Sequence, residues 1–140
     1  LTAAMLTHCG APDKFSLNHS IFMLKQKDWL PIAVNSTQAQ QQRWSVPDRA
    51  AARRAIASDL DFYEIMETRG YRRSEVDRCL ADSAKETELI QASRADSQRL
   101  GIRGTPSFAI NDQLLTGVHR WQELQVELDE RTKPSAAGAD

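Results

Sequence analysis

The sequence predicts an α/β protein, and three observations support this fold class. Apolar residues recur at helical spacing through residues 3–100. Two short strand patterns follow within residues 108–118, on either side of a two-residue turn. A last helical pattern covers residues 120–131. We therefore expect a large helical part, then a small hairpin and a final helix, in a chain of 140 residues.

Glycine and proline residues divide the helical part, because both favour breaks between helices. The apolar spacing predicts helices over residues 3–9, 14–30 (ending before Pro31), 48–70 and 84–100. Asp48 lies at the start of the third of these helices, and its carboxylate can cap the free amides of the first turn.

Two shorter segments lie between these helices. The segment Ser74-Glu75-Val76-Asp77 matches a capping box, which predicts a short helix that contains Cys79. Residues 35–45 are polar and rich in glutamine, which favours a surface loop or a poorly formed helical turn.

The strand patterns predict a hairpin that needs further strands. Residues 108–110 form a short apolar run, and Leu114, Leu115 and Val118 form its partner, with Asn111-Asp112 as the turn. A hairpin of this size is only marginally stable alone. No earlier segment has a strand pattern, and the chain starts at Leu1 without an initiator methionine or a leader pattern. We therefore expect a longer parent chain with at least one upstream strand-helix-strand unit, about 30 residues or more.

The charge balance predicts neither a nucleic-acid partner nor a membrane span. Eighteen basic and 19 acidic residues give a net charge of -1, so no global field attracts polyanions. The apolar runs are far shorter than the 18 residues or more of a membrane helix. A local arginine cluster is expected to be a solvated helix surface, with a partner-binding face as the alternative: Arg49, Arg53, Arg54, Arg72 and Arg73.

The histidines do not predict a metal site. His8 and Cys9 are adjacent and so point to different helix faces, and no second paired motif follows. His19 falls within an apolar helical stripe, so we expect a hydrogen-bonded core histidine. For His119 we likewise expect no metal-binding role.

The most informative motif is Gly-x-x-Gly-Thr-Pro-x-Phe, which runs from Gly101 to Phe108. Together with the following hairpin and helix, and with the pieces Ala-Ala-Met-Leu-Thr-His-Cys and Phe-Ser-Leu-Asn-His-Ser-Ile-Phe near the N-terminus, it resembles the DsbA-like thiol-disulfide oxidoreductases. These proteins have a thioredoxin fold with an inserted helical domain. The resemblance implies that residues 1–100 are mainly the inserted helices and a connecting helix, that residues 101–132 are the C-terminal part of the thioredoxin fold, and that residues 133–140 are a flexible tail.

The resemblance also implies where the chemistry lies. In this family a low-pKa thiolate of a Cys-x-x-Cys pair attacks a substrate disulfide, and the neighbouring cysteine releases the mixed disulfide. Cys9 and Cys79 lie 70 positions apart and do not match that pair, so we expect it upstream. Thr105 and Pro106 match the family's substrate-binding loop. A cis bond before Pro106 would turn the Thr105 backbone toward an extended substrate, and Gly104 would give the backbone room.

The same resemblance implies partners and a compartment. It predicts protein thiols and disulfides as substrates, a redox partner protein, no metal or organic cofactor, and a periplasmic or other extracytoplasmic location. An oxidising compartment favours a structural Cys9–Cys79 disulfide over the alternative of two buried free thiols.

Two other functions stay open at this point. Kappa-type glutathione transferases and their isomerase relatives share the inserted helices, but they usually carry a bulkier aliphatic residue where this chain has Thr105. A redox-inactive thioredoxin-like module that holds a peptide is the second alternative. An upstream Cys-x-x-Cys pair would favour the oxidoreductase, a lone Ser or Cys the transferase, and neither the binding module.

Overall fold

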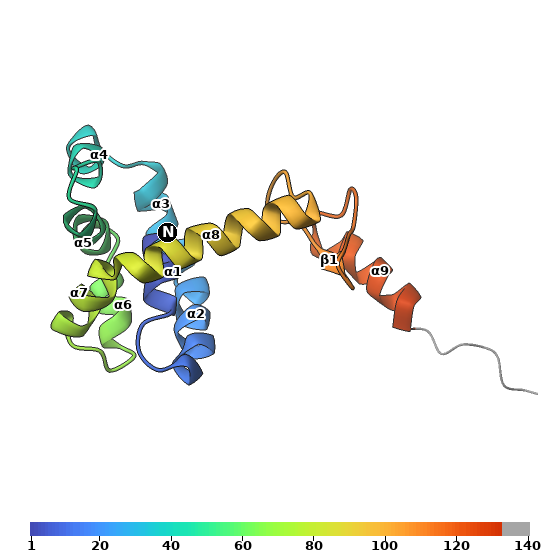
Figure 1. Cartoon of the computed structure of the whole chain (residues 1–140), viewed down its shortest axis with the longest axis horizontal. Helices are drawn as coiled ribbons and strands as arrows, with labels where there is room; N and C mark the ends of the chain where they lie inside the picture. The colour runs from blue at the N-terminus through green and yellow to red at the C-terminus, as the bar shows by residue number, and fades with distance from the viewer. Residues whose placement is uncertain (133–140) are drawn as a thin grey trace, which may run out of the picture. The chain divides into compact units, whose positions relative to one another are not determined.

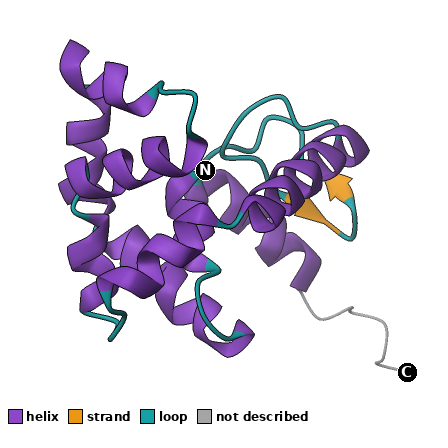
Figure 2. Ribbon diagram, turned by 60° about the vertical axis from the view of Figure 1, so that its left-hand side comes forward, coloured by secondary structure: helices purple, strands orange, loops and turns teal. Residues whose placement is uncertain are grey.

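Helices make up most of residues 1–132, the part of the chain that this computed structural model describes (Figure 1). The chain divides into two units, Leu1–Ile90 and Gln91–Asp140. The first unit is built from helices, whereas both strands of the described residues lie in the second (Figure 2, orange). The predicted tail, residues 133–140, lies outside the described residues.

The chain begins with helix α1 (Thr2–Thr7), close to the predicted helix over residues 3–9. Cys9 lies in the turn after α1, not in the helix. Gly10 follows with φ +87°, and a Cβ at this position would lie 2.6 Å from the hydroxyl oxygen of Tyr71. This turn therefore requires a glycine, both for its backbone conformation and for the close approach of Tyr71.

Residues 14–30 do not form the single predicted helix. After a short 3₁₀ turn, η1 (Pro12–Lys14), they form α2 (Phe15–Leu24) and the start of α3 (Gln26–Val34). The prediction that a helix ends before Pro31 is wrong, because this residue lies inside α3. Proline leaves one carbonyl of the preceding turn without its usual donor. The helix nevertheless continues past Pro31 to Val34. The amide of Asn35 donates to the Pro31 carbonyl at 3.0 Å.

The glutamine-rich segment contains a capped helix, instead of the predicted surface loop or poorly formed helical turn. Helix α4 (Gln38–Trp44) starts after Thr37, whose hydroxyl accepts a hydrogen bond from the Gln40 amide at 3.3 Å. In return, the side-chain oxygen of Gln40 accepts from the Thr37 amide at 2.9 Å. This reciprocal pair is a capping box. The indole of Trp44 also donates to the Asp59 carboxylate at 2.7 Å, which fastens α4 to the following helix.

The predicted helix over residues 48–70 is divided in two. Helix α5 (Arg49–Asp59) and helix α6 (Phe62–Glu67) are separated at Asp61, whose φ is 55°. A left-handed residue cannot continue a right-handed helix, so the chain changes direction here. The cap predicted for Asp48 is confirmed, because its carboxylate accepts from a backbone amide of the first turn of α5 at 3.0 Å.

The next helix does not use the predicted cap. Helix α7 (Arg73–Ala81) contains Cys79 as expected, but Ser74 lies inside its first turn. The carboxylate of Glu75 accepts from the Arg72 amide at 2.8 Å and so caps the helix two residues earlier than predicted. Helix α8 (Ser83–Leu100) follows and matches the prediction for residues 84–100.

The core of the first unit is centred on Phe62, which is 2% exposed. Its ring meets the rings of Phe22 and Trp29 edge to face, at centroid distances of 5.1 and 5.5 Å. Such pairs contribute about 0.5–1.5 kcal/mol beyond the burial of their surface. The buried cluster consists of Leu6, Cys9, Phe22, Ala57, Leu60, Phe62, Tyr63, Ile65, Met66, Tyr71, Val76 and Leu80.

A buried arginine joins three helices of this unit. Arg53 is 5% exposed, lies 2.7 Å from the carboxylate of Glu86 on α8, and donates from Nε to the carbonyl of Leu80 on α7 at 2.5 Å. Arg49 also pairs with Glu86, and its hydrogen bond holds the pKa of this carboxyl below the ordinary value. The expectation of a solvated surface is therefore wrong for Arg53, because a counter-charge distant in sequence accompanies it into the interior.

The second unit contains the predicted hairpin. Strands β1 (Ala109–Ile110) and β2 (Gln113–Leu114) are antiparallel, with Ala109 opposite Leu114 and Ile110 opposite Gln113. Asn111 and Asp112 have φ values of 50° and 62°, as a type I′ turn requires, so the two-residue turn is confirmed.

The strand predicted to reach Val118 is shorter than expected. It ends at Leu114, although the Leu115 amide still donates to the Phe108 carbonyl at 2.8 Å. Helix α9 (Trp121–Thr132) then confirms the predicted final helix. Among the described residues the sheet consists of these two strands.

Candidate functional site

The candidate site is the loop between α8 and β1, residues 101–108, which we call the proline loop. Gly101 ends α8 with φ +68°, and the chain then turns through an exposed segment to the cis peptide bond between Thr105 and Pro106. The amide and the carbonyl of Thr105 make no hydrogen bond to any residue that the structure describes. These two groups are therefore free to pair with another backbone.

Two side chains hold the carbonyl groups on either side of Thr105. The Ser107 hydroxyl donates to the Gly104 carbonyl at 2.6 Å. The Nδ1 atom of His119 lies 2.8 Å from the Pro106 carbonyl oxygen. Because a carbonyl only accepts, Nδ1 carries the proton and donates it. These two hydrogen bonds hold the loop on both sides of Thr105, and Thr105 itself stays exposed.

The position of His119 is itself fixed at the start of α9. One carboxylate oxygen of Glu123 accepts from the backbone amides of His119 and Arg120, at 2.7 and 3.0 Å. The hydrogen bond from the His119 amide is the main reason that the pKa of Glu123 lies below its ordinary value. This carboxylate therefore connects the first turn of α9 to the loop through His119.

A cleft of about 380 Å³ lies beside the loop. This volume falls at the lower end of the range of ligand pockets, about 300–1,000 Å³. Its lining residues come from the loop, the hairpin and the segment before α9: Gly101, Arg103, Gly104, Ser107, Leu114, Leu115, Thr116, Gly117 and His119.

Sequence reasoning placed Thr105 and Pro106 in this loop but missed His119. The contact joins residues 13 positions apart across the hairpin, so no local spacing predicts it. Gly104 lines the cleft, yet a Cβ there would meet no described atom within 4 Å. The described residues leave this position open, and the role expected for Gly104 in the substrate-binding loop stays a prediction.

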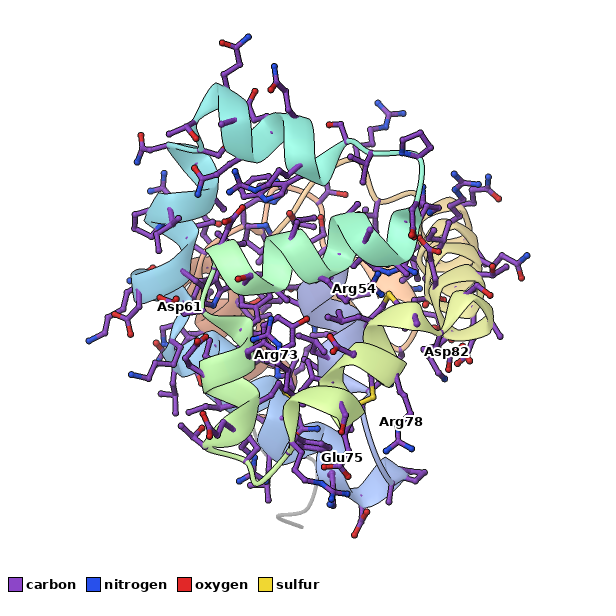
Figure 3. All side chains as sticks on the ribbon, turned by 90° about the vertical axis from the view of Figure 1, so that its left-hand side faces the viewer. Arg54, Asp61, Arg73, Glu75, Arg78 and Asp82 are labelled. Carbon is purple, nitrogen blue, oxygen red and sulfur yellow. A yellow bond between two sulfur atoms is a disulfide. The ribbon has the colours of Figure 1, made fainter. Side chains whose placement is uncertain are left out.

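The two cysteines lie in the first unit and are joined by a disulfide (Figure 3, yellow). Their Cα atoms are 5.6 Å apart, and the bond ties the turn after α1 to α7. The carbonyl of Cys9 accepts from the amide group of Asn18 at 3.1 Å and from the hydroxyl of Tyr71 at 2.6 Å. Asn18 has no exposed surface, so the Cys9 end of the disulfide adjoins a buried polar network, whereas Cys79 is partly buried.

The prediction of a core histidine at position 19 is wrong. His19 is exposed, and its ring lies 5.8 Å from that of Phe15, whereas the neighbouring Asn18 is the buried polar residue of α2. The buried face runs through Asn18 and Phe22, four residues apart, and His19 is rotated about 100° from Asn18 and about 60° from Phe22. Within residues 1–132, no three His, Cys, Asp or Glu side chains are placed to hold a metal ion.

The helical unit, the proline loop, the hairpin and α9 define a thioredoxin-like fold with an inserted helical domain. Residues 1–130 match the family model described as Thioredoxin, and the chain belongs to this family. The structure is similar to the crystal structure of a protein-disulfide isomerase from Novosphingobium aromaticivorans, with 40% sequence identity and a TM-score of 0.86. The match covers 93% of this chain and 66% of that one, so the chain spans just under two thirds of its relative.

No curated protein matches the chain. As for membranes, none of the helices in residues 1–132 is both long and apolar enough to cross one.

Proposed function

We propose that the intact parent protein is a thiol-disulfide oxidoreductase of the DsbA-like type that acts on protein thiols and disulfides. One observation carries this proposal: 93% of the chain aligns, at 40% identity, with a protein-disulfide isomerase. The exposed backbone of Thr105 supports it, because a free amide and carbonyl are what an extended polypeptide needs to add a strand.

In this proposal the chain supplies the substrate-binding half of the reaction site. Residues 101–132 form the C-terminal part of the thioredoxin fold, and residues 1–100 are mainly the inserted helical domain. Thr105 pairs with the substrate backbone, while Gly104 and Pro106 shape the loop. A Cys-x-x-Cys pair upstream of Leu1 supplies the thiols.

The exchange balances in two steps. The first upstream cysteine attacks one sulfur of the substrate disulfide as a thiolate, which forms a mixed disulfide and releases the other substrate sulfur as a thiolate. The second upstream cysteine then attacks the mixed disulfide, so the enzyme pair is oxidised and the substrate is reduced. The reverse sequence oxidises a substrate dithiol. A redox partner protein restores the starting state, and an oxidising, periplasmic-type compartment suits this cycle.

Cys9 and Cys79 have a structural role in this proposal. Cys9 is 3% exposed, and the pair links two helical segments instead of standing at a helix N-terminus as reactive thiols do.

The test starts with the residues that precede Leu1 in the parent protein. We expect a Cys-x-x-Cys pair there and catalysed exchange with a dithiol peptide, which substitution of its first cysteine by Ser abolishes. A lone Ser or Cys with transfer of glutathione to an electrophile would favour the kappa-type transferases. If the upstream residues contain no such thiol and the protein shows no turnover, the function that remains is the redox-inactive peptide-binding module.

A variant of the loop tests the role of Thr105. We expect Thr105→Arg to lower kcat/KM for a protein substrate about tenfold or more, because the long charged side chain obstructs an approaching strand. Thr132→Arg, at the exposed end of α9, is the matched control. Equal kinetics of the two variants would exclude Thr105 from substrate binding.

A further inference from the structure

The helical unit contains a second cleft, of about 310 Å³, between α2–α3 and α6. Its floor is apolar and is formed by Ile21, Trp29, Leu60 and Ile65. Leu60 and Ile65 are 4% and 7% exposed, so they belong to the core of the unit as well as to the floor of the cleft. The opening therefore leads directly onto core side chains.

The aromatic side chain in the floor of this cleft, Trp29, is held in place. The indole of Trp29 donates to the Phe22 carbonyl at 3.1 Å, and its ring meets Phe62 edge to face at 5.5 Å. A side chain with both constraints presents a preformed surface, so a ligand would not have to order it on binding.

The rim of the cleft is acidic. Lys25 and Asp28 form an exposed ion pair at 3.4 Å and largely cancel each other. The other two charged residues that line the cleft are Asp61 and Glu64, which are exposed and whose carboxylates make no hydrogen bond or ion pair with any described residue. Figure 3 labels Asp61 at the junction of α5 and α6, on a different side of the helical unit from Arg78. Two uncompensated negative charges therefore flank an apolar floor.

We propose that this cleft binds a large apolar side chain that is flanked by basic residues in an unfolded polypeptide substrate. The proposal rests on the proposed function, because a thiol-disulfide oxidoreductase acts on chains whose apolar side chains are still exposed. The apolar floor takes the side chain, and the charges of Asp61 and Glu64 complement neighbouring lysine or arginine residues. The cleft thereby selects basic, apolar segments over acidic ones.

The direct test is peptide binding to the intact protein, monitored by NMR. The probe is a blocked, cysteine-free peptide with the sequence Gly-Lys-Phe-Lys-Gly, compared with Gly-Glu-Phe-Glu-Gly. We expect the first peptide to bind with a Kd of about 1 mM or below and to shift the indole N–H signal of Trp29 more than those of Trp44 and Trp121. The Kd of the acidic peptide should be at least about fivefold higher, because each exposed charge pair contributes modestly to the binding free energy.

A double variant tests the rim without disturbing the fold. Asp61→Asn with Glu64→Gln removes both charges, and asparagine tolerates the left-handed backbone at position 61. We expect about three- to tenfold weaker binding of the lysine peptide and a flatter dependence on salt. Glu67→Gln is the matched control, because this exposed carboxylate lies on the same helix but does not line the cleft.

Three results would overturn the inference. These are no shift of the Trp29 signal, equal affinity for the two peptides, and equal affinity of the double variant and the Glu67→Gln control. If another part of the parent protein occupies the cleft, the peptide will not shift the Trp29 signal. The peptides lack cysteine, so binding is measured independently of disulfide exchange. Turnover without binding overturns only this inference, whereas binding without turnover overturns only the proposed oxidoreductase activity.

Discussion

The contact between His119 and Pro106 links a side chain at the start of α9 to the exposed proline loop. The histidine donates from Nδ1 to the Pro106 carbonyl, and Glu123 fixes the backbone from which the histidine extends. This side chain therefore holds the carbonyl of Pro106, the residue that follows Thr105. The contribution of this hydrogen bond to substrate binding can be measured with substitutions of His119 that place a side-chain nitrogen at different distances from Cα.

We predict that His119→Asn retains the loop contact and that His119→Gln loses it. The side-chain nitrogen of asparagine lies at the same number of bonds from Cα as Nδ1, whereas that of glutamine lies one bond further. We expect the Gln variant to raise KM for a protein substrate about two- to tenfold, as the loss of one neutral hydrogen bond implies, with little change in kcat. The Asn variant should stay within about twofold of the parent protein.

The carbonyl carbon signal of Pro106 provides a readout that needs no turnover. It should shift in His119→Gln and stay near its original position in His119→Asn. Identical behaviour of the two variants would contradict a positioning role for Nδ1.

The buried pair of Arg53 and Glu86 gives a prediction of pH dependence. A carboxyl whose pKa is lowered in the folded state contributes stability that is present above its unfolded pKa, near 4.5, and is lost as the pH falls through the lowered value. Glu86→Gln leaves Arg53 buried without its counter-charge and should lower the free energy of unfolding by about 3 kcal/mol at pH 7. The difference between the two proteins should shrink below pH 4.5. Urea titrations at pH 7 and pH 3 check this, and a difference that does not depend on pH would contradict it.

Among the elements, α4 shows how a cap can outweigh composition. The segment is polar and exposed, yet the reciprocal hydrogen bonds between Thr37 and Gln40 satisfy two amides at its start. We predict that Thr37→Ala destabilises α4 by about 1 kcal/mol, which corresponds to about fivefold faster hydrogen exchange of its amides. Thr87→Ala, inside α8, is the control and should leave α4 unchanged. Unaltered exchange in Thr37→Ala would contradict the role of the capping box.

The elements that the sequence predicted correctly are those specified by local signals. The turn at Asn111-Asp112, the Asp48 cap and the final helix all depend on residues within a few positions of one another. The signal of α4 was also present, as threonine followed three residues later by glutamine, but the low apolar content of the segment concealed it. The predictions failed where no local signal marks the outcome: Pro31 lies inside α3 although proline usually ends a helix, and Asp61 takes a left-handed backbone between two helices.

The candidate site was only partly predictable for the same reason. Thr105 and Pro106 belong to a recognisable motif, whereas His119 reaches the loop only because the hairpin folds back between them. Arg53 could not be distinguished from its exposed neighbours, since Glu86 lies 33 positions away and becomes its partner only in the folded unit. Pairings of this kind depend on tertiary structure and not on periodicity or capping.

For the molecule as a whole, the disulfide is the strongest single constraint on the unfolded chain. It closes a loop over a sequence separation of 70, for which the loop-entropy model gives a stabilisation of about 4 kcal/mol. We predict that Cys9→Ser with Cys79→Ser lowers the free energy of unfolding by roughly this amount. Urea titration of the variant and of the oxidised protein measures the difference.

The bond itself can be checked by mass. The oxidised protein should be lighter than the reduced protein by two hydrogen atoms for this bond. Full alkylation of both thiols in an unreduced, denatured sample would contradict the bond.

The same bond has a consequence for a chain that has been cut. Cys9 lies near the N-terminus and Cys79 in α7, so α2 to α6 all lie between the two bridged positions. A protease that nicks any loop in this interval leaves both fragments covalently attached. The nicked molecule would therefore migrate as one band on a denaturing gel and separate into two only after a reducing agent is added.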